Sequence, residues 1–383
     1  MGDLPLGRLE VAVDNSELAP QDLFSLATRN NPKRAFLFVS HVLGKHLAVT
    51  PAAMADVHVR IARRIPTLPQ PIVFIGMAET ATCLGQGVFE AWRREHPEVD
   101  ALYLHTTRYE VPGNTPIHFE EAHSHAPLLW LYEPKDAAIR AKFQQARSLV
   151  LIDDEISTGN TFVNLTHACR SHAPAISHVH FAAITDFTGA ARRAALHERI
   201  PAQLSEGALL YGQWQFEPNG KIIHNAPAAQ SGAANVPHLQ DNGFARLGRT
   251  SCVSLPPQAV DKIAQGIRAG DKVLVLGSGE FMHAAFVLAR ALQQATGAEV
   301  KMHATTRSPI VPWGPIHTVM SFPDNYGEGI TNYLYNYHAG QYDHCFLCHE
   351  TGPNPALTET ARLLGARLLH FRSEFEIEEN PVC

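Results

Sequence analysis

The chain has 383 residues, more than one ordinary domain holds, which predicts two domains. With 45% hydrophobic and 18% charged residues it is not a disordered chain, and its net charge of -6 argues against a broad basic surface for nucleic acid, although not against a local basic pocket. It has no apolar stretch of membrane-spanning length, no secretory signal and too few cysteines, six, for a disulfide framework, so we expect a cytoplasmic protein.

Apolar strand patterns alternate with amphipathic helix patterns along the chain, which predicts an α/β fold built on parallel sheets. The first half contains four expected strands, at 71–76, 101–108, 148–155 and 178–187. Helices are expected after the first and third of them, over 83–96 and 162–172. A long polar stretch, 109–125, follows the second strand and is predicted to be a loop.

Residues 225–242 are rich in Ala, Pro, Asn and Gly and have no period, which predicts a linker between a domain at 1–224 and a domain at 243–383. The alternation then restarts, with strands and helices expected at 271–280, 281–297, 298–307, 341–350 and 356–366. In both halves a strand, a Gly-containing turn with a glutamate, a helix and a strand ending in Thr-Thr-Arg follow one another, which indicates an internal duplication of about 100 residues. The second half shows no counterpart of the acidic pair Asp153 and Asp154.

The segment SLVLIDDEISTGNT, residues 148–161, carries the clearest chemical signal. A buried strand brings Asp153 and Asp154 to the carboxyl end of the sheet, and a turn then opens a helix. The N–H groups of that turn, its hydroxyls and the helix dipole suit a phosphate, and the turn consists of Ser157, Thr158, Gly159, Asn160 and Thr161. Carboxylates beside a phosphate cradle match a ribose 5-phosphate and can help hold Mg²⁺ carried by the ligand. The alternative is an acidic strand end before an ordinary Ser/Thr-capped helix.

This pattern resembles the phosphoribosyl pyrophosphate signature of type I phosphoribosyltransferases, an apolar strand with two acids and a Thr-Gly-x-Thr turn. The resemblance implies that the loop after the first core strand grips pyrophosphate, here Gly76, Met77, Ala78, Glu79 and Thr80. It also implies that the long loop 108–127 closes over the reaction. We assign Arg108 to the leaving pyrophosphate, and Glu120, Glu121 or His123 to the base for an incoming nucleophile. The alternative for each loop acid or imidazole is a solvated loop residue.

The whole chain resembles a narrower family, the bacterial phosphoribosyltransferase–TRSP proteins associated with tellurium-resistance and stress gene clusters. The features that carry the resemblance are Thr306-Arg307-Ser308-Pro309, which gives the TRSP domain its name, and VSHVLGKH (39–46), HTTRY (105–109), EEAHSHAP (120–127) and GSGEF (277–281). The resemblance implies an N-terminal hood over the active-site side and a role in making a nucleoside-like metabolite. Lys45 in that hood is then a candidate for phosphate or acceptor binding, with a surface lysine as the alternative.

The second half offers a further candidate, because VLVLGSGE leads from a strand into a helix. A dinucleotide or S-adenosylmethionine site is disfavoured, since the third glycine and a ribose-binding acid are missing. A second anion site is the more attractive interpretation, built from Gly277, Ser278, Gly279, Glu280, Thr306, Arg307 and Ser308. The alternative is a degenerate duplicate that serves as a scaffold. Cys345 and Cys348 lie in an alternating strand pattern and are expected to be core thiols rather than haem or zinc ligands.

These patterns together predict two related α/β lobes with parallel sheets flanked by helices, the first a type I phosphoribosyltransferase-like fold with an N-terminal hood. The expected function is Mg-dependent displacement of pyrophosphate from phosphoribosyl pyrophosphate by a base-like or other small nucleophile, with Mg²⁺ held by Asp153 and Asp154. The alternatives are a non-catalytic sensor of the same ligand and a purine or pyrimidine salvage enzyme. The expected partners are small molecules, without nucleic acid or membrane. Dimers are common among similar proteins, but the oligomeric state, the acceptor and the role of the second lobe stay open.

Overall fold

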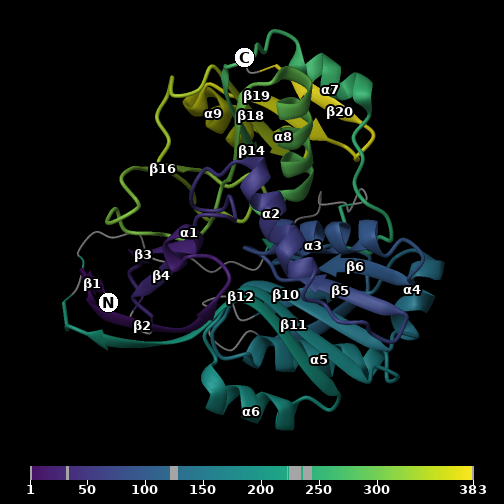
Figure 1. Cartoon of the computed structure of the whole chain (residues 1–383). Helices are drawn as coiled ribbons and strands as arrows, with labels where there is room; N and C mark the ends of the chain where they lie inside the picture. The colour runs from purple at the N-terminus through teal and green to yellow at the C-terminus, as the bar shows by residue number, and fades with distance from the viewer. Residues whose placement is uncertain are drawn as a thin grey trace.

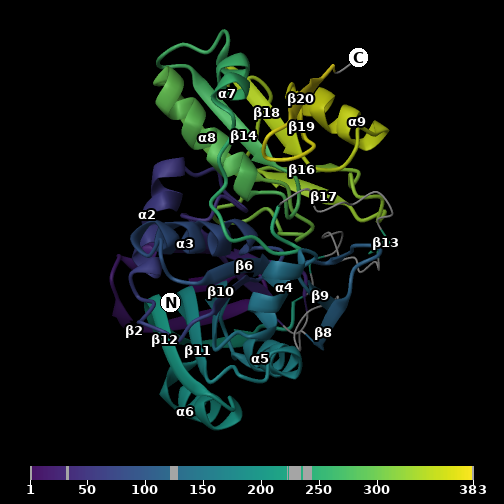
Figure 2. The same cartoon turned by 90° about the vertical axis from the view of Figure 1, so that its right-hand side faces the viewer.

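The computed structural model describes residues 2–31, 34–120, 128–221, 223, 234–235 and 244–381, which fold into two lobes. The first lobe is built on a seven-stranded sheet and the second on a five-stranded sheet. Figures 1 and 2 show the second lobe above the first, with helices α2 (Pro51–Ala62) and α3 (Thr82–Glu95) between them. The predicted class, α/β with two lobes of mainly parallel sheet, is confirmed.

The sheet of the first lobe has the strand order β1-β2-β12-β11-β10-β5-β6. The strands from β12 to β6 are parallel to one another, whereas β2 runs antiparallel to β12 and β1 antiparallel to β2. Their bounds are β1 (Gly2–Leu4), β2 (Gly7–Ser16), β5 (Ile72–Gly76), β6 (Ala101–His105), β10 (Ser148–Ile156), β11 (His178–Asp186) and β12 (Gln203–Pro218). Because β5, β6 and most of β10 and β11 are buried on both faces, they appear in the sequence as continuous apolar runs.

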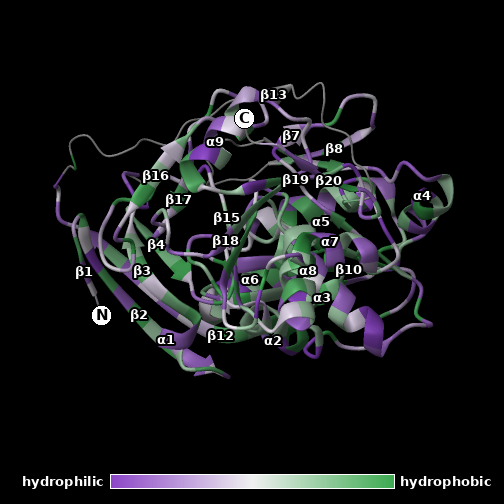
Figure 3. Ribbon diagram, turned by 90° about the horizontal axis from the view of Figure 1, so that it is seen from above, coloured by the Kyte–Doolittle hydropathy of each residue, from purple (hydrophilic) through white to green (hydrophobic). Residues whose placement is uncertain are grey.

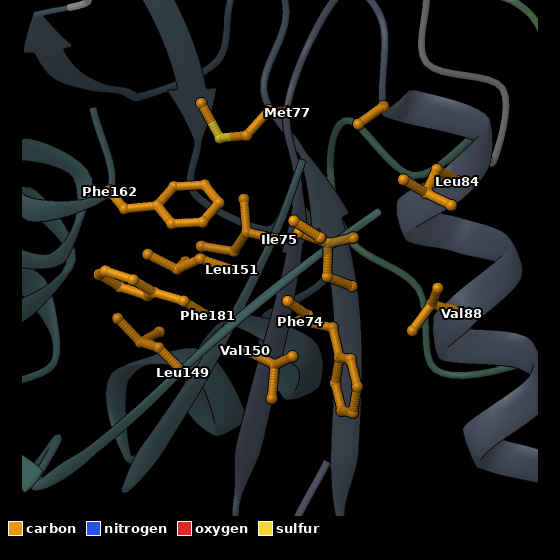
Figure 4. Close-up of a cluster of buried hydrophobic side chains, with 14 of the residues drawn as sticks. Phe74, Ile75, Met77, Leu84, Val88, Leu149, Val150, Leu151, Phe162 and Phe181 are labelled. Atoms are coloured by element: carbon orange, nitrogen blue, oxygen red, sulfur yellow. The ribbon is translucent and has the colours of Figure 1, made fainter. Parts of the chain in front are cut away.

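Helices cover both faces of this sheet and create its hydrophobic core. On one face Phe162 of α5 packs against Phe181 of β11, with ring centroids 4.8 Å apart. On the other, Phe74 of β5 packs against Phe89 and Trp92 of α3. Figure 4 shows part of this core on the two sides of the strands. The remaining helices of the first lobe are α1 (Pro20–Leu23), α4 (Ala137–Gln144), α5 (Asn160–His172) and α6 (Gly189–Arg199).

An N-terminal hairpin, β3 (Phe24–Thr28) and β4 (Phe36–Ser40), forms the hood of the first lobe. Phe38 of this hairpin stacks on Phe187, which directly follows β11, with ring centroids 4.6 Å apart. The hood therefore lies at the carboxyl end of the parallel strands, the end at which ligands bind in open α/β sheets.

The long stretch after β6 is more ordered than the sequence indicates. The predicted polar loop at 109–125 contains β7 (Tyr109–Glu110) and β8 (Pro116–Glu120), and β8 pairs antiparallel with β9 (Leu128–Tyr132). The alternation of Ile117 and Phe119 with polar residues lets one face of this hairpin be buried. Glu121, His123 and His125 lie outside the described residues.

The second lobe repeats the arrangement of the first on a smaller scale. Its sheet has the order β15-β14-β18-β19-β20, parallel except for the last strand. Its elements are α7 (Pro257–Ala264), β14 (Lys272–Gly277), α8 (His283–Thr296), β15 (Glu299–Ala304), β16 (Val319–Phe322), β17 (Asn332–Tyr335), β18 (His344–His349), α9 (Pro355–Leu364), β19 (Arg367–Phe371) and β20 (Ile377–Asn380). The strands and helices predicted from the second half are confirmed, with ends that differ by a few residues.

Topology and local contacts support the internal duplication. In each lobe a strand, helix, strand, hairpin, strand, helix and strand follow in the same order, and β6-β5-β10-β11 matches β15-β14-β18-β19. In the first lobe the hydroxyl of Tyr132 accepts a hydrogen bond from the N–H of Val111 at 2.8 Å, and in the second Tyr335 accepts one from Ile310 at 2.8 Å. The repeat therefore extends through the hairpin, where Trp-Leu-Tyr corresponds to Tyr-Leu-Tyr.

The second half lacks the acidic pair of the first, as the sequence indicates, but it keeps one of the two acids. Ile152 of β10 pairs with Gly76, and Cys348 of β18 pairs with Gly277, so the two strands have the same register in their sheets. Counting two residues onward places Glu350 at the position of Asp154. The second lobe therefore keeps one acid at this strand end. The correspondence is hard to detect from the sequence because Glu replaces Asp and the following turn is different.

Each lobe also borrows a segment from the other. Val49, ahead of α2, exchanges backbone hydrogen bonds with Met302 at the edge of β15, while Arg249 does so with Tyr103 at the edge of β6. Val49 and Met54 belong to the hydrophobic core of the second lobe. The expected linker 225–242 lies outside the described residues except for β13 (Ala234–Asn235), which pairs with β7.

Hydrophobic residues concentrate toward the middle of the molecule and hydrophilic ones toward its periphery, as the hydropathy colouring in Figure 3 shows. Within the described part of the chain, no helix combines the length and apolar character needed to cross a bilayer.

Candidate functional site

The turn between β10 and α5 presents unpaired backbone donors at the carboxyl end of the sheet. Among the described residues, no hydrogen bond uses the N–H groups of Ser157, Thr158, Gly159 or Thr161. Gly159 is the N-cap of α5 with φ of 74° and gives no side-chain cap, so the first turn of the helix keeps its donors. These N–H groups and the helix dipole make a site that suits a phosphate.

Two carboxylates precede this turn. Asp153 and Asp154 are half-buried, and the Asp153 carboxylate accepts a hydrogen bond from the backbone N–H of Asp154 at 2.9 Å. Burial raises the pKa of Asp154 to about 6; the negative charge of Glu155 adds to this, and the hydrogen bond with Asp153 opposes it. Glu155 itself is held by Arg34 of the hood through bonds of 2.7 and 2.8 Å.

The same two carboxylates fit a magnesium ion that arrives with a ligand. Mg²⁺ prefers oxygen donors and is commonly held by one or two carboxylates together with substrate phosphates and water. Asp153 and Asp154 supply such oxygens next to the phosphate-suited turn. No group of three or more His, Cys, Asp and Glu side chains suited to a metal ion occurs in the described ranges.

The loop after β5 offers a second set of donors. The N–H of Met77 bonds to the carbonyl of Ile152 at 3.0 Å and that of Ala78 to the hydroxyl of Thr106 at 2.8 Å, which fixes the loop between neighbouring strands. The N–H groups of Glu79 and Thr80 have no acceptor among the described residues. Two consecutive free N–H groups form a concavity that favours an anion.

Glycine is required where this loop begins. A Cβ on Gly76 would lie 2.4 Å from the hydroxyl of Tyr103 and 3.3 Å from the Cα of Gly85. The loop therefore packs tightly against α3 and β6, and its backbone has little freedom to move.

The side chain of Glu79 points to the other lobe. Its carboxylate forms ion pairs with Lys45 at 2.6 Å and with Arg307 of the second lobe at 3.1 Å. Burial opposes the ionisation of Glu79, but these two positive charges outweigh it and hold its pKa below the usual range. Glu79 is therefore a charged group whose partners are supplied from outside its own loop.

Lys45 is buried between the lobes, so the surface-lysine alternative is wrong. Its side chain is 1% exposed, and its ammonium group also donates to the carbonyls of Gly279 at 2.8 Å and Thr305 at 3.0 Å. Two of its N–H groups are thus used by carbonyls, and its charge is paired with the carboxylate of Glu79. Lys45 is neither a surface lysine nor a free cation for phosphate, and it instead connects the two lobes.

The corresponding loop of the second lobe makes the reciprocal contact. The carboxylate of Glu280 accepts hydrogen bonds from the hydroxyl of Thr107 at 2.6 Å and from the backbone N–H of Arg108 at 2.7 Å. Buried Arg246 adds an ion pair with Glu280 at 3.2 Å. Each of the two duplicated glutamates thus crosses the interface to the strand end of the opposite lobe.

The second anion site expected from the sequence is closed by internal contacts. Arg307 pairs with Glu79 and also with Glu328 at 2.7 Å, and Gly279 donates its N–H to Thr305 at 2.8 Å. The N–H of Phe281, at the position of Thr80, bonds to the carbonyl of Ser278. No open site therefore forms from Gly277, Ser278, Gly279, Glu280, Thr306, Arg307 and Ser308.

The second lobe has also lost its phosphate-suited turn. Pro353 and Pro355 replace residues with N–H groups, and the side chain of Asn354 caps the N–H of Leu357 at 3.0 Å. Glu350, at the position of Asp154, is bound by Arg246 at 2.6 and 2.7 Å. This arrangement favours the scaffold interpretation of the second lobe.

A small cavity with a mixed polar and apolar lining lies at the interface between the lobes. Its volume of about 20 Å³ suits one water molecule rather than a metabolite. It is lined by Thr82, Gln86, His105, Phe244, Arg246, Val253, Glu280, Phe281, Met282, His283 and Ala284.

Other predicted residues fall in several places. Arg108 is half-buried three residues after the end of β6, close to the loop 76–80, and Glu120 is the last residue of β8. His123 lies outside the described residues. Cys345 and Cys348 are buried free thiols, as expected, and burial raises the pKa of Cys345 to about 12.

Sequence reasoning missed Arg34 and Arg246. One signal marked the segment next to Arg246: Leu-Gly-Arg at 247–249 resembles Leu-Gly-Lys at 43–45, and an interlobe backbone pairing lies at Arg249 in one case and at Val49 in the other. The ion pair of Arg34 with Glu155 joins residues 121 positions apart and has no sequence signal.

The sequence matches two family models in tandem. Residues 23–213 match a family described as phosphoribosyl transferase, and residues 245–366 match a TRSP domain described as C-terminal to it. No curated protein matches the chain.

Several solved structures are similar to part of the chain. An adenine phosphoribosyl transferase from Trypanosoma brucei is 15% identical over 51% of this chain and 81% of its own, with a TM-score of 0.36. The adenine phosphoribosyltransferase from Leishmania tarentolae is 12% identical over 49% of this chain and 84% of its own, with a TM-score of 0.34. An orotate phosphoribosyltransferase from Mycobacterium tuberculosis is 14% identical over 49% of this chain and 90% of its own, with a TM-score of 0.28.

Proposed function

We propose, because the chain belongs to the phosphoribosyl transferase family with a C-terminal TRSP domain, that it transfers the ribose 5-phosphate group of phosphoribosyl pyrophosphate to a small nucleophile. One observation carries this proposal. The first lobe keeps unpaired N–H groups both in the loop 76–80 and in the turn 157–161, at the carboxyl ends of the adjacent strands β5 and β10. A ribose with a phosphate group at each end is a ligand of the right chemistry for two such sites.

The proposed roles follow from this placement. The turn 157–161 binds the 5-phosphate, and Asp153 and Asp154 accept hydrogen bonds from the ring hydroxyls. Since the pKa of Asp154 is about 6, its carboxylate is mostly ionised at neutral pH. Mg²⁺ would be held by the same two carboxylates, and its positive charge would offset the negative charge of the pyrophosphate.

The reaction breaks the bond between the anomeric carbon and the pyrophosphate oxygen and forms a bond from that carbon to the nucleophile. The loop 76–80 and Arg108 stabilise the negative charge of the departing pyrophosphate. The proton of the nucleophile passes to a base on the loop 108–127, for which we keep Glu120, Glu121 and His123 as candidates. The hood at the carboxyl end of β11 supports an acceptor site on this side.

The acceptor we propose is a base-like or other small nucleophile, used to make a nucleoside-like metabolite linked to tellurium or stress response. This finer proposal rests on the family resemblance of the sequence. The five described cysteines are free thiols, in keeping with the reducing cytoplasm in which we place the protein.

Pyrophosphate release tests the proposed function. Wild-type protein is incubated with phosphoribosyl pyrophosphate, Mg²⁺ and a panel of nucleobases or a small-metabolite extract, and mass spectrometry identifies the product. Asp154→Asn should reduce turnover by about 10² or more, because the ring hydroxyls lose a charged acceptor. Asp56→Asn, an exposed acid paired with Arg60 on α2, is the control and should keep wild-type turnover.

Two results would contradict the proposal. Turnover that Asp154→Asn leaves unchanged would remove the assigned site. Tight binding of phosphoribosyl pyrophosphate without release for any acceptor would instead support a sensor.

A further inference from the structure

We propose that Arg307 of the second lobe is a positioning residue for the pyrophosphate loop of the first lobe and acts through Glu79. This inference rests on the proposed function. It gives the TRSP lobe a defined part in a reaction that takes place on the other lobe.

The contact between the lobes is specific and reciprocal. Glu79 reaches Arg307 across the interface, and its duplicate Glu280 reaches Thr107 and the backbone of Arg108. Both contacts join a loop that follows the first core strand of one lobe to the end of the second core strand of the other. The second lobe thus holds the loop 76–80 through the side chain of Glu79, and the backbone N–H of the same residue is free for the ligand.

Arg307 is itself firmly placed. Besides Glu79 it binds Glu328 at 2.7 Å, and its guanidinium lies 5.6 Å from the ring centre of Tyr109 in the first lobe. Burial disfavours its charge, but the neighbouring acidic groups outweigh this and hold the pKa of Arg307 above its usual range. A permanent positive charge therefore stands beside the Glu79 carboxylate.

This charge matters because pyrophosphate is an anion. Without Arg307, the negative charge of Glu79 would be only partly neutralised by Lys45 and would repel a ligand that approaches the N–H groups of Glu79 and Thr80. Arg307 draws the carboxylate toward the second lobe and offsets its charge. The second lobe has no phosphate-suited turn of its own at Asn354, so Arg307 has no phosphate to bind there. The contacts of Arg307 with Glu79 and Glu328 instead support a role across the interface.

The test uses the full-length chain and separates this role from general stability. Binding of phosphoribosyl pyrophosphate with Mg²⁺ is measured by calorimetry, and KM and kcat are measured separately. Arg307→Gln should raise Kd and KM roughly tenfold with a smaller change in kcat, the scale of one lost charge-assisted hydrogen bond. Arg307→Lys should recover part of the loss, because it restores the charge without the fork that reaches both Glu79 and Glu328.

A double variant tests whether the effect passes through Glu79. When Glu79→Gln removes the negative charge, adding Arg307→Gln should raise KM much less than in the wild-type background. Arg249→Gln is the matched control. It breaks a buried ion pair with Glu374 in the segment that bridges the lobes, without touching the loop 76–80, and should leave KM unchanged.

The outcomes separate this inference from the proposed function. If the wild type does not bind phosphoribosyl pyrophosphate, the proposed function fails and this inference fails with it. If the wild type binds it and Arg307→Gln binds it equally well, the inference alone is overturned. Equal losses in Arg307→Gln and Arg249→Gln would also overturn it, since a general weakening of the interface would then explain both.

Discussion

Asp154 has the chemistry of a binding residue at some cost to the free protein. Asp154 is half-buried, and the loss of water around its carboxyl, together with the negative charge of Glu155, raises its pKa to about 6 from an ordinary value of 3.8. A carboxyl whose pKa is higher in the folded state stabilises the fold when protonated, and this contribution is lost as the pH rises through about 6. At neutral pH the free protein therefore holds a charge that it would be more stable without.

Asp154→Asn should consequently stabilise the protein in a pH-dependent way. At pH 8 the Asn variant should unfold at a higher temperature than the wild type, because the wild type carries the buried charge and the variant does not. At pH 5 the folded wild type is mostly protonated while its unfolded chain is mostly ionised, so the difference should fall to roughly half of its value at pH 8. Thermal unfolding of both proteins at the two pH values measures this, and an equal difference at both would show that the carboxyl does not titrate as described.

At the scale of single elements, the turn before α5 depends on one backbone conformation. Gly159 has φ of 74°, and a Cβ there would lie 2.7 Å from a methyl carbon of Leu196. Gly159→Ala should lower the free energy of unfolding by about 1–3 kcal/mol and weaken phosphate binding, because strain and crowding displace the N–H donors.

Gly113→Ala is a matched control for that change. Gly113 has nearly the same φ, 76°, but a Cβ added there would meet no other atom within 4 Å. The Gly113→Ala variant should lose stability through the strain of the left-handed conformation, but it should keep its affinity for phosphate. Chemical denaturation and phosphate calorimetry distinguish the two, and equal phosphate affinity in both variants would contradict the role of the turn.

The elements differ in how far their sequence predicts them. The strands β5, β10 and β14 were predictable because burial on both faces leaves an apolar run, and β11 and β18 were recognisable although histidines interrupt or flank their apolar residues. The hood strands and the hairpin β8–β9 were not, because each of these strands is only five residues long and pairs only with its neighbour in a hairpin outside the main sheet.

The candidate site divides in the same way. The acids at 153–154 and the turn 157–161 are local and could be predicted from one segment. The pairing of Glu79 with Arg307 spans 228 positions, so it depends on how the lobes dock. For the same reason Lys45 and the second-lobe loop were assigned to ligands in the sequence, whereas their charges are used between the lobes.

At the scale of the whole molecule, the two lobes are joined by buried charges as well as by shared apolar contacts. Arg246 is 1% exposed and binds Glu350 and Glu280, and the first-lobe residues Val49 and Met54 complete the second lobe's core. Because neither lobe has a complete core alone, we expect the described lobes to unfold together.

Arg246→Gln should lower the free energy of unfolding by about 3–5 kcal/mol, since it leaves two buried carboxylates without their cation. The variant should keep a single calorimetric transition. Arg367→Gln, which breaks a more exposed ion pair with Glu379, is the control and should cost about 1 kcal/mol or less. Two separate transitions in the wild type or in Arg246→Gln would contradict the shared core.

The exchange of segments at the two sheet edges has a consequence for how this architecture can be inherited. The segment ahead of α2 pairs with β15 of the second lobe, and the segment around Arg249 pairs with β6 of the first. A recombination event at the boundary between the two halves would therefore separate each lobe from the segment of the other half that pairs with its edge strand. The two halves are thus expected to evolve together. A change at the edge strand of one lobe should be matched by a change in the segment of the other half that pairs with it.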